Sequence, residues 1–150
     1  ALALQATGVD GLLAGARIAV LGAESERWMA QPVVDALPAG RCINLIGQPL
    51  PIAAATIERS SLYVGNDSGL MHIAAATGTP TLGLFGPSPE KRYGPWGKHC
   101  ASVRTDEGFK ELVLARDFDH RSQKSLMTGL SVDKAYEALA NLYTSVKNDS

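Results

Sequence analysis

The chain has 150 residues, of which 45% are hydrophobic and 19% are charged, enough for one domain with its own core. Its 14 basic and 15 acidic side chains give a formal charge of −1, which argues against a nucleic-acid binder that neutralises phosphates. No apolar run approaches the roughly 18 residues of a membrane-spanning helix. The two cysteines, Cys42 and Cys100, lack metal-ligand spacing, so we expect two half-buried free thiols.

Apolar runs alternate with segments of helical period, the pattern of a parallel sheet covered by helices. In chain order we expect a helix end at 1–6, a strand at 17–21, a helix at 24–37, a strand at 42–46, a helix at 52–59, a strand at 62–64, a helix at 70–77 and strands at 81–85 and 98–103. Prolines make 86–97 a predicted loop, 104–130 has no clear period, and 131–146 is a predicted amphipathic helix. The expected fold class is α/β, a Rossmann-like, doubly wound parallel sheet.

The beginning of the chain differs from that of an ordinary doubly wound domain. Residues 1–6 have the character of a helix end, and no predicted strand precedes them. We therefore expect a fragment that lacks its opening strand. An unpaired strand edge or an uncovered apolar face would make such a fragment marginally stable or self-associating.

The strongest local signal is a predicted strand, then Gly65-Asn66-Asp67-Ser68-Gly69, then a predicted helix. In open α/β sheets ligands bind beyond the carboxyl ends of the strands, where the N–H groups of a helix start favour an anion such as phosphate. Ser68 and Gly69 lie where those donors should be unpaired, and Gly69 lets a ligand approach the backbone. Asp67 is either a helix N-cap or an acceptor for sugar hydroxyls. A sugar diphosphate would use both properties of this segment.

Other polar side chains also have two interpretations each. His72, five residues after Asp67, either has a structural place in its helix or donates to an anion or a sugar hydroxyl. Glu24 and Glu26, just past the first predicted strand, either interact with the helix dipole or hold the hydroxyls of a nucleotide ribose.

The remaining candidate side chains lie in the second half of the chain. Lys91 and Arg92, in the predicted loop, either face solvent or neutralise phosphate. His120 lies among Asp117, Asp119 and Arg121, and we interpret this stretch as solvated polar surface rather than a metal site.

Residues 63–86 read YVGNDSGLMHIAAATGTPTLGLFG and are followed by Pro87-Ser88 and by Gly94-Pro95-Trp96-Gly97. This succession resembles the lipopolysaccharide heptosyltransferases of glycosyltransferase family nine, in which the same pieces recur in the same order. The resemblance covers about 17–100 and the closing helix. It is to the C-terminal, donor-binding half of a two-domain GT-B enzyme.

The resemblance implies an enzyme that moves a sugar from a nucleotide-diphosphate donor such as ADP-heptose to a lipopolysaccharide core acceptor. It implies that Asp67 contacts the sugar and that the backbone of Ser68, Gly69 and Leu70 holds the diphosphate. It also implies that Glu24 or Glu26 binds the ribose and that residues 48–50 flank the base. The donor is a substrate, and neither a cofactor nor a metal is expected. The expected location is the cytoplasm, in solution or at the inner face of the inner membrane.

The matched segment leaves out the N-terminal domain of that family, where the glycolipid acceptor site and the catalytic base are expected. We therefore expect no catalytic residue in this chain and no transfer activity from it alone. Two alternatives stay open, namely a related sugar-nucleotide epimerase and a binding module that has lost the chemistry.

Overall fold

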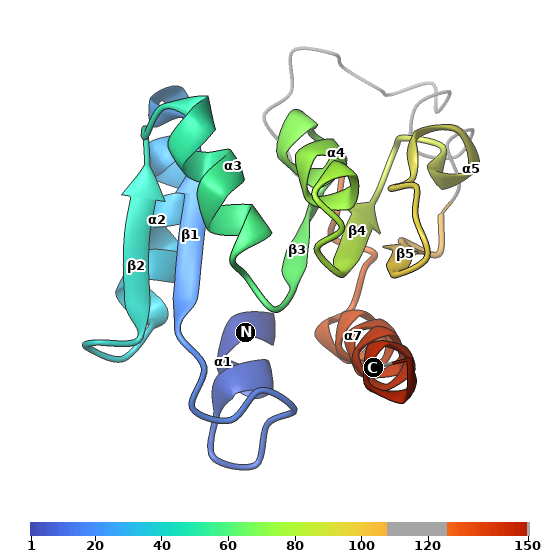
Figure 1. Cartoon of the computed structure of the whole chain (residues 1–150), viewed down its shortest axis with the longest axis horizontal. Coiled ribbons are helices and arrows are strands. Elements are labelled where there is room, and N and C mark those ends of the chain that lie inside the picture. Colours follow the sequence, from blue (N-terminus) through green and yellow to red (C-terminus); the bar gives the residue numbers. More distant parts are fainter. Residues whose placement is uncertain (108–125, 150) are drawn as a thin grey trace. The chain divides into compact units, whose positions relative to one another are not determined.

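The computed structural model describes residues 1–107 and 126–149. The chain divides into two compact units, Ala1–Arg59 (unit 1) and Ser60–Ser150 (unit 2). In each unit strands alternate with helices, and every strand pair among the described residues is parallel, which confirms the predicted α/β class (Figure 1). In the part of the chain that the structure describes, no helix is both long and apolar enough to cross a membrane.

Unit 1 is built around two parallel strands. Its elements are α1 (Leu2–Thr7), β1 (Ile18–Gly22), the 3₁₀ turn η1 (Glu24–Glu26), α2 (Arg27–Ala36), β2 (Cys42–Ile46) and α3 (Leu50–Glu58). The core contains Val20 of β1, Ile46 of β2 and Leu37 just after α2, with Ala30 and Val34 of α2 packed against it. Positions 30, 34 and 37 recur at helical spacing, so one face of α2 covers the strands.

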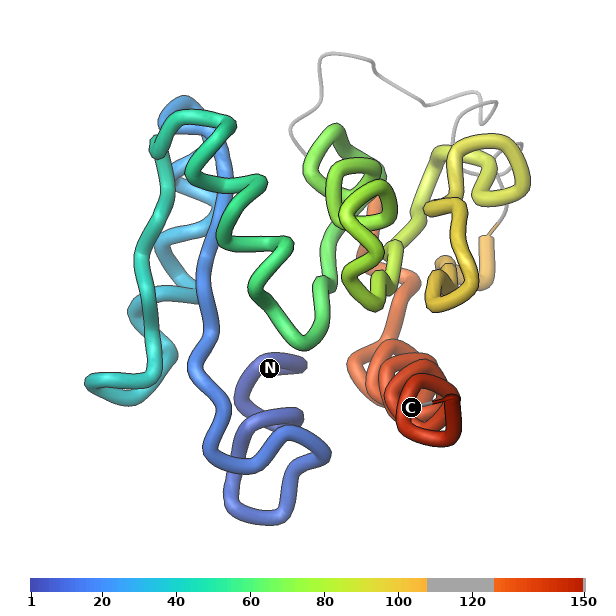
Figure 2. The backbone as a smooth tube through the Cα atoms, in the orientation of Figure 1, coloured from blue at the N-terminus to red at the C-terminus, as the bar shows by residue number. Residues whose placement is uncertain are grey.

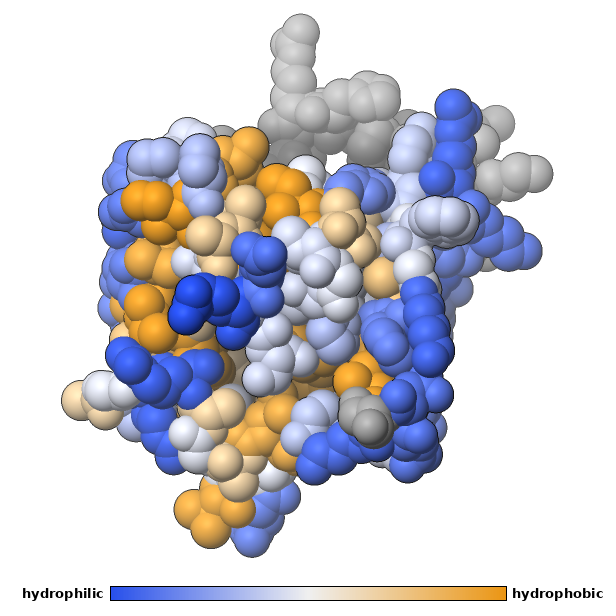
Figure 3. Space-filling view, viewed as in Figure 1, coloured by the Kyte–Doolittle hydropathy of each residue, from blue (hydrophilic) through white to orange (hydrophobic). Residues whose placement is uncertain are grey.

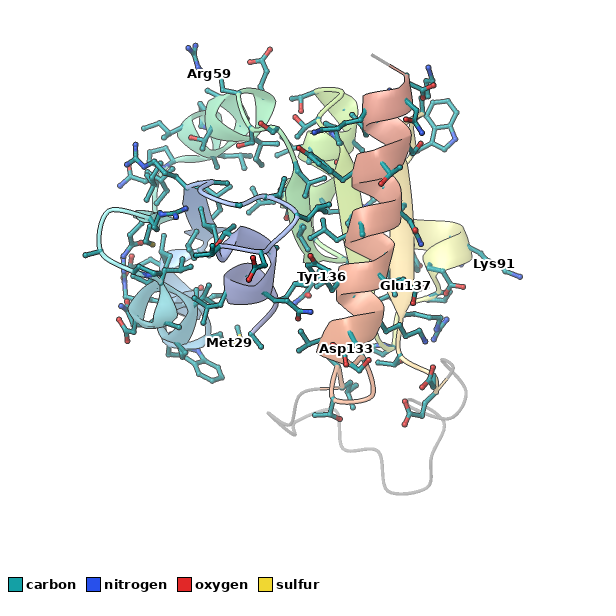
Figure 4. The ribbon with its side chains drawn as sticks, turned by 90° about the horizontal axis from the view of Figure 1, so that it is seen from below. Met29, Arg59, Lys91, Asp133, Tyr136 and Glu137 are labelled. Carbon is teal, nitrogen blue, oxygen red and sulfur yellow. The ribbon has the colours of Figure 1, made fainter. Side chains whose placement is uncertain are left out.

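Unit 1 also has apolar side chains on its surface. On α2, the side chains of Trp28 and Met29 are 62% and 52% exposed, and Met29 projects from the helix in Figure 4. On α3, Leu50 and Ile52 are exposed, and apolar colour lies over this part of the unit in Figure 3. These residues lie outside the cluster that holds β1 and β2 together.

Among the described residues of unit 2, three parallel strands lie in the order β3-β4-β5, and their backbone can be followed in Figure 2. Its elements are β3 (Tyr63–Asn66), α4 (Gly69–Ala76), β4 (Thr81–Phe85), α5 (Glu90–Tyr93), β5 (Cys100–Arg104) and α7 (Val132–Asn148). The helix α4 packs on β3 and β4, and α7 packs on β4 and β5. Because β4 is central, its Leu82 and Phe85 are fully buried, as expected for a parallel strand covered by helices.

Gly83, in the middle of β4, determines how closely α4 can pack. A Cβ atom at this position would lie 2.8 Å from the sulfur of Met71 and 2.7 Å from the ring of Phe85. Met71 is itself fully buried on α4. The missing side chain of Gly83 therefore provides the space into which α4 inserts Met71.

The closing helix α7 confirms the amphipathic helix predicted from the sequence. Its N-cap is Ser131, whose side chain accepts a hydrogen bond from the N–H of Lys134 at 3.1 Å. Ala135, Leu139 and Leu142 are the buried residues of this helix and share one face. Burial of a leucine side chain stabilises a fold by about 1.5–3 kcal/mol, so α7 contributes substantially to unit 2.

Three local predictions need correction. The helix expected at 24–37 begins as the 3₁₀ turn η1, and the helix expected at 52–59 begins at Leu50. The predicted loop 86–97 contains the one-turn helix α5, because the carbonyl of Pro89 accepts hydrogen bonds from the N–H groups of Arg92 and Tyr93 at 3.0 and 3.1 Å. Cys42 and Cys100 are free and partly buried, as predicted.

Candidate functional site

The candidate site begins where β3 gives way to α4. Asp67 and Ser68 form the connection, and the N-cap of α4 is Ser68, with an extended backbone at φ −157° and ψ 166°. Because the chain remains extended through Ser68, the helix starts one residue too late for Asp67 to cap it. The N-cap interpretation of Asp67 is therefore wrong, and its carboxylate does not satisfy the helix start.

Two backbone donors are unpaired at the start of α4. The carbonyl of Ser68 accepts hydrogen bonds from the N–H groups of Met71 and His72, at 3.1 and 3.4 Å. Within the described residues, the N–H groups of Gly69 and Leu70 have no hydrogen-bond partner, and the side chain of Ser68 does not cap the helix. A Cβ atom at Gly69 would meet nothing within 4 Å. The positive end of the helix dipole thus borders open space, which suits an anion.

Asp67 and His72 lie together at this end of α4. The Asp67 side chain is 25% exposed and that of His72 52%, and Oδ1 of Asp67 is 3.9 Å from Nε2 of His72. This separation is longer than a hydrogen bond. Both side chains can therefore still bind a ligand group, the carboxylate as an acceptor and the imidazole as a donor.

Tyr63 is a polar residue of this site that sequence reasoning missed. Burial raises the pKa of its hydroxyl, and the neighbouring Ser68 side chain partly opposes this effect. A Cβ atom at Gly65 would lie 2.7 and 2.8 Å from Cζ and Cε1 of the Tyr63 ring, so the ring lies over Gly65. A tyrosine two residues before a glycine in a strand was the available signal, because positions two apart share one face.

In unit 1 the carboxyl ends of both strands meet at Glu24. Oε1 of Glu24 is 2.5 Å from Nε of Arg27 and Oε2 is 2.6 Å from Nη2, and Nη2 also donates to the carbonyl of Ile46 at 3.1 Å. The hydrogen bonds and charge of Arg27 lower the pKa of the Glu24 carboxyl. Gly47, with φ +82°, lies against this carboxylate and leaves no room for a side chain. Glu24 is thus held in one orientation at this edge.

Glu26 has a different, local partner. Its carboxylate accepts a hydrogen bond from the N–H of Ala23 at 3.3 Å, at the start of η1. The structure therefore gives Glu26 a helix-start contact, whereas Glu24 lies against Gly47, the residue that follows β2.

A single guanidinium organises the segments that follow β4 and β5. Nη1 of Arg104 pairs with the carboxylate of Glu90 at 2.5 Å, and Nη2 donates to the carbonyls of Gly86 and Glu107 at 3.1 and 3.2 Å. A backbone hydrogen bond and then the Arg104 pair lower the pKa of Glu90 against the opposing effect of burial. Arg104 thereby fixes the segment after β4 beside the end of β5.

Lys91 and Arg92, interpreted either as solvent-facing charges or as partners of phosphate, lie on α5. The Lys91 side chain points away from the strands (Figure 4). The guanidinium of Arg92 lies 5.3 Å from the centroid of the Tyr93 ring. The choice between these two interpretations stays open.

No group of three or more metal-binding side chains occurs among residues 1–107 and 126–149. The segment with His120, Asp117, Asp119 and Arg121 lies outside the described residues.

The fold of this chain is similar to that of solved glycosyltransferase structures. A glycosyltransferase family 9 structure from Veillonella parvula DSM 2008 superimposes with a TM-score of 0.70 and 26% identity, covering 85% of this chain and 36% of that chain. The structure of E. coli ADP-heptose lps heptosyltransferase II matches in fold with a TM-score of 0.69 and 23% identity, covering 89% of this chain and 38% of that one. The parallel α/β fold is therefore that of one part of a glycosyltransferase.

The family follows from the sequence pattern. The pattern of glycosyltransferase family 9 (heptosyltransferase) matches residues 12–120. The chain belongs to glycosyltransferase family 9.

Curated relatives include Lipooligosaccharide heptosyltransferase 2 of Haemophilus influenzae, 32% identical over 135 residues. Lipopolysaccharide heptosyltransferase 2 of Escherichia coli K12 is 31% identical over 96 residues, covering 63% of this chain and 24% of that protein. The match with the H. influenzae protein covers 84% of this chain but only 38% of that protein. The activities in these names therefore describe proteins much longer than the matched segment.

Proposed function

We propose that this chain binds the donor substrate of a glycosyltransferase, a nucleotide-diphosphate sugar such as ADP-heptose. We further propose that the whole protein transfers that sugar to a lipopolysaccharide core acceptor. The observation that carries the proposal is the pair of unpaired N–H groups, Gly69 and Leu70, beside open space at the end of β3. The names of the relatives support the choice of heptose and of the acceptor.

Each polar group that we assign to the start of α4 has a distinct place in this proposal. The N–H groups of Gly69 and Leu70 bind diphosphate oxygens, because a helix start favours anions. Asp67 accepts hydrogen bonds from sugar hydroxyls, for which its carboxylate is free of any capping contact. His72 donates to the diphosphate or to the sugar.

In unit 1, Glu24 or Glu26 accepts from the ribose hydroxyls, and residues 48–50 flank the base. Glu24 is the stronger candidate because Arg27 and Gly47 already fix its orientation at the carboxyl ends of both strands.

The proposed reaction makes specific demands on these groups. The bond between the anomeric carbon and the phosphate oxygen breaks, and the nucleoside diphosphate leaves with additional negative charge. Fixed N–H donors stabilise that charge without reorganising. The acceptor hydroxyl oxygen bonds to the anomeric carbon, and its proton passes to a base that we place outside this chain.

The test is calorimetric titration of the whole protein with ADP and with ADP-heptose. Gly69→Val should weaken both by crowding the diphosphate, and Asp67→Asn should weaken only the sugar-bearing ligand. Glu137→Gln is a matched control, because it removes one carboxylate charge from the exposed side of α7 (Figure 4). Wild-type protein that binds neither ligand, or variants that bind as well as wild type, would contradict the proposal. Product analysis with and without acceptor separates transfer from epimerisation.

A further inference from the structure

The segment that contains the end of α5 and leads to β5 exposes two aromatic side chains of unit 2. Residues 91–98 read KRYGPWGK. Trp96 is 92% exposed and Tyr93 is 41% exposed. An indole ring is large and mostly apolar, so an indole left in water adds almost nothing to the packing of the core. The ring of Trp96 is therefore available to a partner.

Trp96 follows two residues that are packed against the sheet. A Cβ atom at Gly83, in the middle of β4, would lie 3.2 Å from Cδ of Pro95. A Cβ atom at Gly94 would lie 3.1 Å from Oγ of Ser102 on β5. Because the backbone just before Trp96 is held by these contacts, a partner that binds the indole has little backbone to order.

Three cations accompany the two aromatic rings. Lys91, Arg92 and Lys98 are exposed, and residues 91–98 include no acidic side chain. The Lys91 side chain extends away from the strands of unit 2 (Figure 4). The segment thus combines exposed aromatic rings with exposed positive charge.

Nearby carboxylates compensate only part of this charge. Glu90 is paired with Arg104 inside unit 2. Oδ2 of Asp149 lies 3.3 Å from Nζ of Lys98. Among the described residues, the two cations of α5 form no ion pair. This part of the surface therefore keeps an excess of positive charge.

We propose that residues 91–98 form a docking surface for an anionic lipid membrane: the two aromatic rings enter the headgroup region and the three cations contact lipid phosphates. Tryptophan and tyrosine suit this region because each has an apolar ring and one polar group. An anionic leaflet attracts each cation held near it. The inference goes beyond the proposed function, because the partner is a membrane surface rather than the donor.

The composition of the segment favours a membrane over a second protein. Lysine is depleted in protein–protein interfaces. Clusters of lysine and arginine beside a membrane instead bind anionic lipids. Residues 91–98 begin and end with a lysine, and Trp96 lies between them. Charge complementarity therefore selects an anionic lipid surface as the occupant.

The test is co-sedimentation of the whole protein with vesicles of phosphatidylcholine alone, and of phosphatidylcholine mixed with an equal amount of phosphatidylglycerol. We expect tighter binding to the mixed vesicles, and weaker binding as salt is added. Trp96→Ser should weaken this binding about tenfold, and Trp96→Phe, which keeps an aromatic ring, clearly less. Lys91→Gln and Arg92→Gln should each weaken it about fivefold.

Unit 1 provides matched controls. Trp28 on α2 is 62% exposed, and Arg59 is an exposed cation just after α3. Trp28→Ser and Arg59→Gln make the same kinds of change outside residues 91–98, so both should bind vesicles like wild type. ADP titration of Trp96→Ser should equal that of wild type, because docking and donor binding use different residues.

The inference is refuted if the wild-type protein does not sediment with the mixed vesicles, or if Trp96→Ser binds them equally well. Equal losses in Trp28→Ser and Trp96→Ser would refute the assignment to residues 91–98. A lower oligomeric state of Trp96→Ser in light scattering, with vesicle binding unchanged, would show a contact between copies instead. If Trp96→Ser does not fold, Lys91→Gln decides. All these outcomes leave the proposed function intact, since ADP and ADP-heptose binding tests it separately.

Discussion

Replacement of Gly69 by alanine should raise stability and reduce ligand binding at once. Gly69 is the first residue of α4, its φ lies outside the left-handed region, and an added Cβ atom meets nothing within 4 Å. Gly→Ala at such a compatible position stabilises a protein by about 0.4–1 kcal/mol, because the unfolded chain loses freedom. For a chain of this size, that corresponds to a melting temperature about 1–4 °C higher.

The same methyl group would occupy the space that the diphosphate needs. If it separates one phosphate oxygen from the backbone N–H groups, the complex loses a charged hydrogen bond of about 1.5–3 kcal/mol. That loss is equivalent to affinity lower by about tenfold to a hundredfold. Gly69→Val should lower the affinity further. Calorimetric unfolding and ADP titration of the same preparations provide both values.

Gly78 supplies the control at the opposite end of α4. It also has nothing within 4 Å of an added Cβ atom, but its φ is +78°. Gly78→Ala should therefore cost about 1–2 kcal/mol of stability and leave the ADP affinity of the folded protein unchanged. Destabilisation of Gly69→Ala, or ADP binding equal to wild type, would refute the reasoning about the helix start.

Asp67→Asn should leave the unfolding free energy unchanged, because Asp67 is not the N-cap. In donor kinetics of the whole protein, it should lower the rate or affinity for the donor sugar by about tenfold to a hundredfold. A stability loss above about 1 kcal/mol would contradict this prediction. Ser131→Ala should lower the free energy of unfolding, measured in denaturant, by about 0.5–2 kcal/mol, because Ser131 caps α7. Ser68→Ala should lower it clearly less, because Ser68 makes no capping hydrogen bond. Equal losses would show that both serines cap their helices. The folded-state pKa of Glu90 is lowered, so its stabilising contribution is complete above about 4.5, its ordinary value, and disappears as pH falls through the lowered pKa. Acid unfolding curves should show a smaller loss over this range in Arg104→Met, and identical curves would contradict the pairing.

The strands were the most predictable elements of the chain. Buried parallel strands are short apolar runs between turn residues, and the expected bounds of β2 and β4 agree with the structure. Helix starts were less predictable because Pro49 and Ser68 are compatible with more than one first helical residue. The one-turn helix α5 has too few residues to show a period.

The position of the candidate residues could be predicted where a general rule applies, but not where it depends on contacts across the fold. A turn after a parallel strand lies at the carboxyl edge of the sheet, where open α/β sheets commonly bind ligands, and this rule predicted the place of Asp67 and Gly69 between β3 and α4. Arg27 could have been found from its spacing of three residues to Glu24. The pairing of Arg104 with Glu90, 14 residues apart, requires knowledge of how β5 lies beside β4.

Gly83 connects the interior of unit 2 with the proposed chemistry. Because Met71 fills the space above this glycine, the distance between α4 and β4 is determined in the core rather than at the ligand edge. Any larger residue at position 83 would lift the helix and carry the Gly69 and Leu70 donors away from the strand ends. A displacement of about 1 Å can reduce catalysis a hundredfold. Gly83 would thus determine the position of the proposed diphosphate site from within the core, without contacting the ligand.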